Sequence, residues 1–297
     1  MQATDVIWMD GAFVAWDDAK VHVISHALHY ASGVFEGIRF YETPEGPAIF
    51  RLQEHIDRLF VSAKKIGMQI PFTREQLVRA TVELIAKNKV GSGYIRPIAF
   101  FGYGGMGLTP KGAAINVAIA CWPWPAFLGD KPIKVKTSSF IRIHPKSTHA
   151  DAKITGHYIN SLLAAQEAHA EGYDEALLLD WEGFVAEGPG ENVFAVKDGV
   201  LYTPPLGAIL PGITRDSVIT IARDLGIEVR QMTLTPQDLR NAEELFFTGT
   251  AVEVAPIGAL DDKTFGPGPV TARLRSVYSD AVHGKAQQYR RWLTIVR

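Results

Sequence analysis

Apolar residues recur along this chain at two spacings, one typical of amphipathic helices and one typical of strands. The helical spacing of i, i+3, i+4 and i+7 is clear in residues 54–66, at Ile56, Leu59, Phe60, Ala63 and Ile66. Thr73 and Gln76 then match a capping box, which predicts that a second helix begins there. Further helices are predicted over residues 159–170, 214–225 and 270–282, with Thr214 as an N-cap.

Short strands are predicted between these helices. Asp10-Gly11 and Asp198-Gly199 accept the positive φ angles of tight hairpins, and short apolar runs flank each dipeptide. Other predicted strands cover residues 94–101, 114–121, 133–140, 176–180, 184–186 and 227–232. The mixture of helices and strands predicts a fold of the α/β (α+β) class.

A change of composition near residue 122 predicts a domain boundary. Residues 123–132 combine prolines and a glycine with aromatic side chains, which is typical of a semi-rigid connection. We therefore expect a small domain over residues 1–122, a linker over residues 123–132 and a larger domain over residues 133–297. A chain of 297 residues has room for two such domains.

Composition narrows the class of partner. The 30 Lys and Arg against 32 Asp and Glu leave a net charge of −2, so no field draws the chain to nucleic acid or an anionic membrane. The expected partner is a small molecule. Cys121 is the single cysteine, which excludes an internal disulfide and a cysteine-based metal site. No apolar run approaches the ~20 residues of a membrane span, and the acidic start is unlike a signal peptide. These features predict a cytoplasmic protein.

Three histidines, His22, His26 and His29, fall at helical spacing and could in principle offer imidazoles to a metal. The Val-His-Val alternation around His22 is more typical of a strand, and no HExxH-type general base accompanies the three. We therefore expect hydrogen-bonded structural histidines and no metal site.

Lys153 and Glu187 are the first candidates for chemistry. Lys153 lies in an apolar setting just before a predicted helix, and desolvation favours the neutral, nucleophilic amine. Glu187 follows in a Glu-Gly-Pro-Gly-Glu-Asn segment, and a buried carboxylate can keep a pyridine nitrogen protonated. The pair suggests a pyridoxal phosphate (PLP) enzyme. The alternative is a lysine at a helix start and a glutamate in a surface turn, which these two residues alone would favour.

Several segments are suited to anions. Arg58 lies near the apolar stripe of a predicted helix, where it is either solvated or directed at an anion. Arg96 lies within an apolar strand and needs an anionic partner. Residues 210–214 place a glycine before a helix start, whose backbone N–H groups suit a phosphate, although every helix has such an end. The Thr-Gly-Thr turn of residues 248–250 offers hydroxyls and amides, or is a plain connector.

Seven motifs in one order resemble branched-chain amino acid aminotransferases of PLP fold type IV, the class IV aminotransferase family. They are Ser25–Tyr30 with Phe35–Arg39, Tyr94–Pro97, Gly105–Gly107, Lys153 with Tyr158, Glu187–Asn192, Leu210–Arg215 and Gly249–Ala251. The resemblance runs from Ile7 to about Trp292. It implies a small N-terminal α/β domain and a larger, β-barrel-like C-terminal domain with flanking helices. One departure is His157, where relatives carry asparagine.

The resemblance implies a role for each matching residue. Lys153 would carry PLP covalently and be the catalytic residue, Glu187 would pair with the pyridine N1, and Tyr158 would bind the ring hydroxyl. The phosphate would be held by Arg58, Ile213, Thr214 and Thr250, with Leu210 and Gly212 also at the cofactor. The positions that match the substrate pocket are Tyr30, Phe35, Gly37, Tyr94, Arg96, Met106, Gly107, Leu108, Trp124, Thr250 and Ala251.

The implied activity is a reversible transfer of the amino group from leucine, isoleucine or valine to 2-oxoglutarate. Tyr30 and residues 106–108 would reach in from a neighbouring subunit, so a homo-oligomer built on a dimer is expected, with a hexamer left open. Rivals of the same fold are D-amino acid aminotransferase, (R)-amine transaminase and aminodeoxychorismate lyase. The Tyr94–Pro97 and Gly105–Gly107 segments favour the branched-chain enzyme. A binding protein without turnover is disfavoured because Lys153, Tyr158 and Glu187 are all present.

Overall fold

The computed structural model describes residues 2–124, 131–266 and 268–297. The chain divides into two compact units. Unit 1 holds the described part of residues 1–125 with Ala152–Gly156 and Ala281–Arg297; unit 2 holds the described part of residues 126–151 with His157–Asp280. Two segments that the predicted boundaries assign to the larger domain therefore group with unit 1. Most of the predicted linker, residues 125–130, lies outside the described residues.

Unit 1 is built on an antiparallel sheet, eight-stranded over the described residues. Its order β17-β5-β4-β6-β7-β1-β2 corresponds to Leu293–Ile295, Gly46–Phe50, Ile38–Thr43, Gly93–Phe101, Ile115–Trp122, Val6–Met9 and Ala12–Ala15, and β3 (Gly33–Phe35) pairs with β6. The predicted hairpin is confirmed, because Asp10 (φ 49°) and Gly11 (φ 97°) turn β1 into β2.

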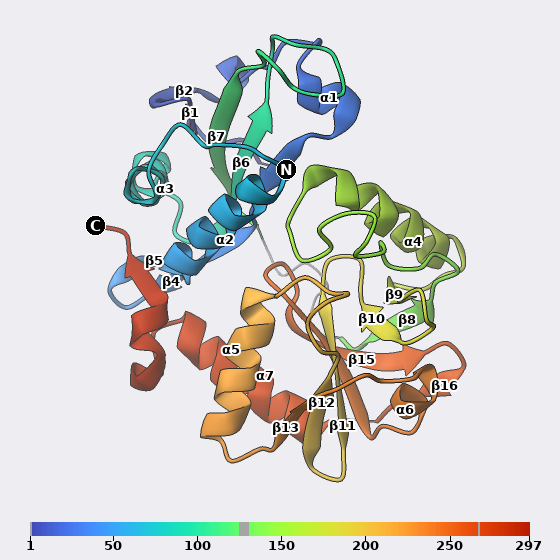
Figure 1. The fold of residues 1–297 in the computed structure, drawn as a ribbon. Helices are drawn as coiled ribbons and strands as arrows, with labels where there is room; N and C mark the ends of the chain where they lie inside the picture. Colours follow the sequence, from blue (N-terminus) through green and yellow to red (C-terminus); the bar gives the residue numbers. More distant parts are fainter. Residues whose placement is uncertain (1, 125–130, 267) are drawn as a thin grey trace. The chain divides into compact units, whose positions relative to one another are not determined.

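Helices α2 (Leu52–Lys65) and α3 (Arg74–Asn88) lie against this sheet (Figure 1). Their apolar stripes, which include Ile56 and Leu77, are buried against strand residues such as Phe40. The predicted capping box begins α3: Thr73 Oγ1 accepts from the Gln76 amide, and Gln76 returns the bond to Thr73 N. Unit 1 also holds the short α1 (His26–Tyr30) and the 3-10 helices Trp16–Asp18 and Gln287–Trp292.

Unit 2 is built on a mixed sheet, nine-stranded over the described residues, that curls into a half-barrel. Its order β10-β9-β8-β15-β14-β11-β12-β13 corresponds to Val185–Glu187, Glu175–Leu179, Ile133–Thr137, Glu253–Leu260, Glu244–Gly249, Asn192–Lys197, Val200–Thr203 and Val229–Gln231, and β16 (Lys263–Thr264) pairs with β15. Together with unit 1, this arrangement confirms the predicted mixed α/β class with a barrel-like larger sheet.

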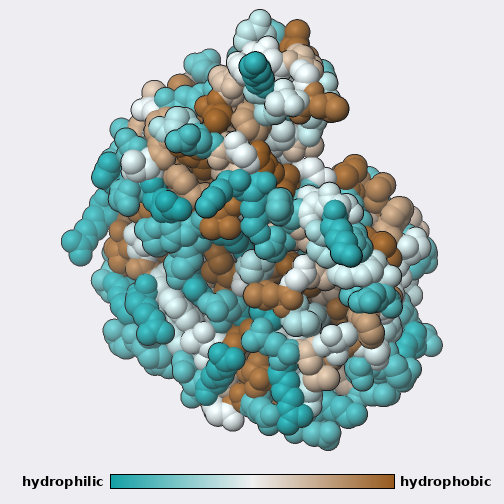
Figure 2. All heavy atoms as spheres, viewed as in Figure 1, coloured by the Kyte–Doolittle hydropathy of each residue, from teal (hydrophilic) through white to brown (hydrophobic). Residues whose placement is uncertain are grey.

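The helices of unit 2 include α4 (Tyr158–Ala170), α5 (Ile213–Asp224) and α6 (Pro236–Arg240), while α7 (Pro269–Val282) ends within unit 1. A 3-10 turn, Thr155–His157, precedes α4. Ala164 and Ala168 of α4 pack on β9, and small side chains allow this close approach. The opposite side of α4 exposes Ile159 and Leu162, and Figure 2 shows apolar atoms gathered over this helix.

Two local predictions are wrong. Thr214 is not the N-cap of α5: the cap is Gly212 and the helix begins at Ile213. A Cβ at residue 212 would overlap the Asn192 side-chain oxygen, so any larger residue would have to displace this carboxamide. The segment around His22 is not a strand, because His22 precedes a turn that leads into α1. Within residues 2–124, 131–266 and 268–297, no helix has both the length and the apolar character that crossing a bilayer needs.

Candidate functional site

Lys153 lies on a short extended segment that unit 1 holds by its backbone. The neighbouring Ile154 forms an antiparallel bridge with Val34 on β3. The amide of Lys153 donates to Ser62 Oγ of α2 at 3.0 Å, and its carbonyl accepts from the Phe35 amide at 3.1 Å. The flanking apolar residues Ala152 and Ile154 are buried. Lys153 is therefore fixed between a strand end and a helix, in the apolar setting that the sequence predicted.

An aromatic cluster faces the Lys153 side chain. The Lys153 Nζ lies 5.0 Å from the centroid of the Phe35 ring, and the Arg96 guanidinium lies 4.8 Å from the same ring. Arg96 also lies 5.4 Å from the Tyr94 ring, and that ring contacts Trp124 at 4.9 Å between centroids. Four predicted substrate residues thus form one group beside the lysine: Phe35, Tyr94, Arg96 and Trp124.

Arg96 has an unusual environment for a cation. Its Nε is buried and has no hydrogen-bond partner among the described residues. Stacking on Phe35 and Tyr94 stabilises the charge but leaves this donor unused. A buried guanidinium N–H without a hydrogen bond costs free energy. The arrangement therefore suits an anion that binds from outside the described chain.

Gly37 is required by the side chain opposite it. A Cβ at residue 37 would overlap the Tyr94 hydroxyl, closer than any side chain tolerates. Gly37 therefore leaves room for the Tyr94 hydroxyl beside the backbone between β3 and β4. Gly37 thus belongs to the substrate group through the residue that packs on it.

Arg58 is placed by a carboxylate that the sequence reasoning missed. Glu36, which is fully buried, accepts from Arg58 Nε at 2.7 Å and Nη2 at 2.8 Å, and from His55 Nδ1 at 2.8 Å. Burial alone would raise the pKa of the Glu36 carboxyl, but the charge and hydrogen bonds of Arg58, with His55, hold that pKa well below its usual range. Burial lowers the pKa of His55, and the Arg58 and Lys153 charges lower it further.

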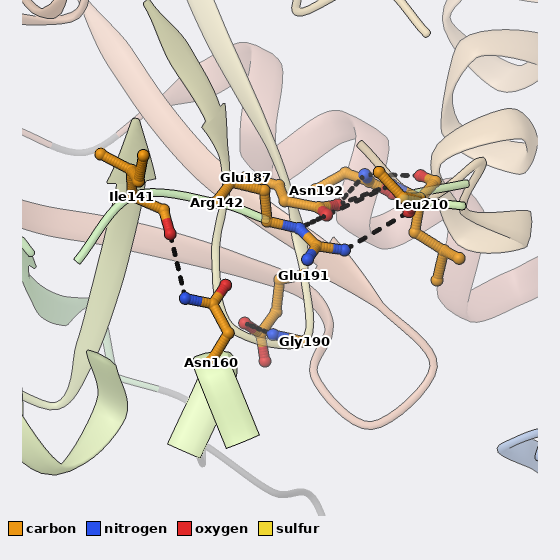
Figure 3. Close-up of polar contacts among 9 residues, drawn as sticks. Ile141, Arg142, Asn160, Glu187, Gly190, Glu191, Asn192 and Leu210 are labelled. Atoms are coloured by element: carbon orange, nitrogen blue, oxygen red, sulfur yellow. Dashed lines mark hydrogen bonds and ion pairs between the residues drawn. The ribbon is translucent and has the colours of Figure 1, made fainter. Parts of the chain in front are cut away.

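Glu187 ends β10 in unit 2, where three donors converge on its carboxylate (Figure 3). Arg142 Nε donates to Oε1 at 2.6 Å, Asn192 Nδ2 donates to Oε2 at 3.0 Å, and the Leu210 amide lies 3.1 and 3.2 Å from the two oxygens. Every donor favours the ionised form of the carboxylate. The group is a fixed, buried anion, as a partner of a protonated pyridine nitrogen must be.

The start of α5 adjoins this carboxylate through Asn192. Besides binding Glu187, Asn192 Nδ2 donates to the Leu210 carbonyl at 3.0 Å, and the Asn192 side-chain oxygen occupies the space that a side chain at residue 212 would need. Ile213 and Thr214 are buried. Because they lie in the first turn of α5, their amides have no intrahelical acceptors. The structure thus links the Leu210–Thr214 segment to Glu187.

The remaining predicted cofactor and substrate residues of unit 2 lie at element ends. Tyr158 begins α4, and the preceding His157 donates to or accepts from Thr148 Oγ1 at 2.7 Å. Thr250 and Ala251 follow β14 and are partly buried. His157, the departure from the resemblance, therefore bonds to a residue before Lys153.

Tyr30 and residues 106–108 lie together in unit 1. The Tyr30 hydroxyl donates to the Met106 carbonyl at 3.0 Å, and His26, which is buried, joins Ser32 Oγ to the Gly107 carbonyl through its two ring nitrogens. Tyr30, Met106 and Leu108 are nevertheless exposed, Leu108 by 85%. His26 thus has a hydrogen-bonded structural position, and among the described residues no group of three potential ligands for a metal occurs.

Four site residues had no role in the sequence analysis: Glu36, His55, Arg142 and Asn192. Glu36 and Asn192 stand inside motifs that were singled out, so their position was a usable signal. His55 lies three residues before Arg58 on the predicted helix, which places both on one face. Arg142 gave no signal, because only the fold brings it to Glu187.

Comparison with known proteins defines the class. The model of the amino-transferase class IV family matches residues 33–260. The chain therefore belongs to the class IV aminotransferase family, whose members use PLP.

Within that family, several relatives that match over the full length of the chain are named branched-chain aminotransferases. The branched-chain-amino-acid aminotransferase of Pseudomonas aeruginosa is 49% identical over 98% of this chain and 97% of its own length. The enzyme of that name from Escherichia coli K12 is 44% identical over 97% and 96%. The branched-chain aminotransferase of the archaeon Thermoproteus uzoniensis, solved with norvaline, is 43% identical with a TM-score of 0.97, covering 99% of this chain and 100% of its own.

The residues present fit PLP. A lysine in an apolar setting, a buried carboxylate with three donors, and a glycine-capped helix start supply partners for an aldehyde, a pyridine nitrogen and a phosphate. These are donor types that a pyridoxyl phosphate needs, and they stand at the positions that the motifs predicted.

Proposed function

We propose that this chain is a PLP-dependent branched-chain aminotransferase, which reversibly transfers the amino group of leucine, isoleucine or valine to 2-oxoglutarate. The observation that carries the proposal is the placement of Lys153 Nζ and the Arg96 guanidinium on one Phe35 ring. An amine, an apolar wall and a single cation in one group suit both an apolar side chain and a carboxylate. The two full-length bacterial relatives bear the name of this activity.

We assign PLP to the following residues: Arg58, Lys153, Tyr158, Glu187, Leu210, Gly212, Ile213, Thr214 and Thr250. When bound, PLP supplies an electron sink for the pair left by the broken Cα–H bond. Glu187 keeps the pyridine nitrogen protonated because three donors fix its negative charge. Arg58, the amides of Ile213 and Thr214, and Thr250 hold the phosphate.

Lys153 is the proposed general base and acid. Once the incoming amine has released it, Nζ accepts the proton from the substrate Cα and returns it later in the half-reaction. Its backbone bonds to Ser62 and Phe35 hold the residue in place while the side chain moves. The Phe35 ring lies 5.0 Å from the amine and forms an apolar wall beside it.

The substrate pocket is proposed to combine Tyr30, Phe35, Gly37, Tyr94, Arg96, Met106, Gly107, Leu108, Trp124, Thr250 and Ala251. Tyr30 and residues 106–108 serve a second copy of the chain in this proposal, which their exposure in the single chain supports. The expected assembly is a homo-oligomer built on a dimer. A cytoplasmic location is part of the proposal and agrees with the single, buried Cys121.

A substrate profile tests the proposed reaction. The purified protein is assayed with L-amino acids, D-amino acids and (R)-1-phenylethylamine, each with 2-oxoglutarate, in a coupled assay for glutamate. We expect the highest kcat/KM with L-leucine, L-isoleucine or L-valine. Faster turnover of D-amino acids or of the R-amine would assign the chain to another activity of the same family.

Labelling tests the lysine. Borohydride reduction should fix the chromophore to the peptide that contains Lys153, and Lys153→Ala should abolish transamination. Attachment elsewhere would overturn the assignment.

The glutamate is tested separately. Glu187→Gln should still bind PLP and lose most of its kcat, because an amide cannot hold the nitrogen proton. Near-normal kcat would remove the role from Glu187.

A further inference from the structure

Helix α2 presents three polar side chains on one face. His55, Arg58 and Ser62 follow the i, i+3, i+7 spacing of a single stripe. His55 and Arg58 both donate to Glu36, and Ser62 Oγ accepts from the Lys153 amide. One helix face therefore fixes both the carboxylate behind Arg58 and the backbone of the lysine.

Glu36 is itself fixed at both ends. Its amide donates to the Pro97 carbonyl at 2.9 Å, and the preceding Phe35 amide donates to the Lys153 carbonyl. The dipeptide Phe35-Glu36 thus contacts Lys153 through its backbone and Arg58 through its side chain. A ligand with an aldehyde and a phosphate at a set separation needs its two protein partners at a set separation as well.

The hydrogen-bond pattern admits one arrangement. A carboxylate paired with Arg58 through both of its oxygens accepts hydrogen bonds, so His55 Nδ1 is the donor in the third bond. Arg58 uses Nε and Nη2 in a two-point pair, which fixes the plane of the guanidinium. A guanidinium has five N–H bonds, so three are directed away from Glu36. The Arg58–Glu36 pair is electrically neutral. Its three remaining N–H bonds would therefore bind a phosphate through their direction rather than through net charge.

We propose that Glu36, held by His55, is the positioning residue that orients Arg58 for the cofactor phosphate. The inference rests on the proposed function, in which Arg58 binds that phosphate. It adds a carboxylate and a histidine that touch neither cofactor nor substrate and act through the arginine. If the ion pair served only as a strut, its loss would weaken the binding of all ligands alike.

Pyridoxal, which lacks the phosphate, separates the two roles. Apoprotein is prepared with hydroxylamine and titrated with PLP and with pyridoxal, following tryptophan fluorescence. For Glu36→Gln we expect the Kd for PLP to rise by about tenfold to a hundredfold, as when an orienting partner is lost behind a metal ligand. The Kd for pyridoxal should change by less than about twofold. An equal rise for both ligands would overturn the proposal.

His55 gives a second test that removes no charge. His55→Leu deletes the donor to Glu36, whereas His55→Asn keeps an N–H at the position of Nδ1. We expect a selective loss of PLP affinity in His55→Leu and its recovery in His55→Asn. If Glu36→Gln does not fold, as judged by near-ultraviolet circular dichroism, this pair decides the question. Equal affinities in the two His55 variants would contradict the proposal.

Two further variants separate this inference from the proposed function. Asp57→Asn removes a half-exposed carboxylate of α2 that pairs with Arg74 of α3 at 2.9 Å, and should leave both Kd values unchanged. Arg58→Ala should lose PLP affinity selectively. If it does while the Glu36 and His55 variants do not, the positioning role is wrong and the phosphate role of Arg58 stands. If the parent binds no PLP, the proposed function itself fails.

Discussion

At the scale of single residues, burial decides which charged and nucleophilic groups can react. The Arg96 guanidinium lies against two aromatic rings and has a buried Nε that no described residue satisfies. Cys121 differs from Arg96 because its thiol has a partner. It is fully buried on β7, and its sulfur accepts a hydrogen bond from Asn88 Nδ2 at 3.3 Å. The unused donor of Arg96 suits an anionic ligand, whereas the buried Cys121 thiol is shielded from reagents.

Arg96→Ala should separate the two half-reactions. Glutamate places its side-chain carboxylate where leucine places an alkyl group, and losing one partner of a buried charged pair costs about 2 to 5 kcal/mol. We expect kcat/KM for glutamate to fall at least about tenfold, and kcat/KM for leucine to fall far less.

Single-turnover rates with each substrate measure the two losses. Arg96→Lys is the matched control, because it keeps the charge without the planar fork and should retain part of the glutamate rate. Equal losses for leucine and glutamate would show that Arg96 is a structural strut.

Cys121 should not react in the native protein. Burial raises the pKa of its thiol to about 11, so almost no thiolate is present at neutral pH. A thiol reagent such as 5,5'-dithiobis(2-nitrobenzoate) should label nothing in the folded protein and one thiol per chain in urea. Rapid labelling without urea would contradict the burial of this side chain.

At the scale of elements, the beginnings of helices carry much of the site. The α3 start is set by its own sequence, in the reciprocal bonds of Thr73 and Gln76. The α5 start is set from a distance, because Asn192 fills the space beside Gly212 and also holds Glu187. A substitution at Gly212 should therefore move Asn192 and so disturb the Glu187 carboxylate.

Gly212→Ala tests that link. The new Cβ would displace the Asn192 carboxamide, and overpacking of this kind costs about 1 to 3 kcal/mol. Gly190→Ala is the control, because a Cβ there meets nothing within 4 Å. Urea unfolding of both variants compares the costs, and equal values would show that the Asn192 contact is unimportant.

The same contrast explains how much could be predicted from the sequence. The Asp10-Gly11 hairpin and the α3 cap depend on neighbours in the chain, and both predictions are confirmed. The motif residues Lys153, Phe35, Tyr94 and Arg96 were found by pattern, and the fold groups them. The N-cap of α5 and the roles of Glu36 and Arg142 depend on partners distant in the chain, which no local pattern indicates.

At the scale of the whole molecule, the buried Glu36 contributes to the pH dependence of stability. In the unfolded chain the pKa of Glu36 returns to about 4.5, whereas Arg58 and His55 keep the folded pKa well below that value. Below about pH 4.5 the unfolded chain therefore takes up a proton that the folded chain does not. The contribution is complete above this pH and is lost as the pH falls.

We expect Glu36→Gln to reduce the loss of unfolding free energy between about pH 6 and about pH 3.5. Urea titrations at both pH values measure it, and Asp57→Asn, whose carboxylate is about half exposed, should keep more of the parental slope. A parental slope in Glu36→Gln would remove Glu36 from the acid response.

The return of distant segments to unit 1 constrains the order in which the chain can fold during synthesis. The edge strand β17 pairs with β5, so one edge of β5 stays unpaired until residues 293–295 have been made. These residues are made roughly tens of seconds after residues 46–50. The segment with Lys153 likewise joins β3 only after β8 has been made. A nascent chain therefore exposes an unpaired β5 edge for most of its synthesis. Until the last strand is made, this edge offers unpaired N–H and C=O groups to which other strands could pair.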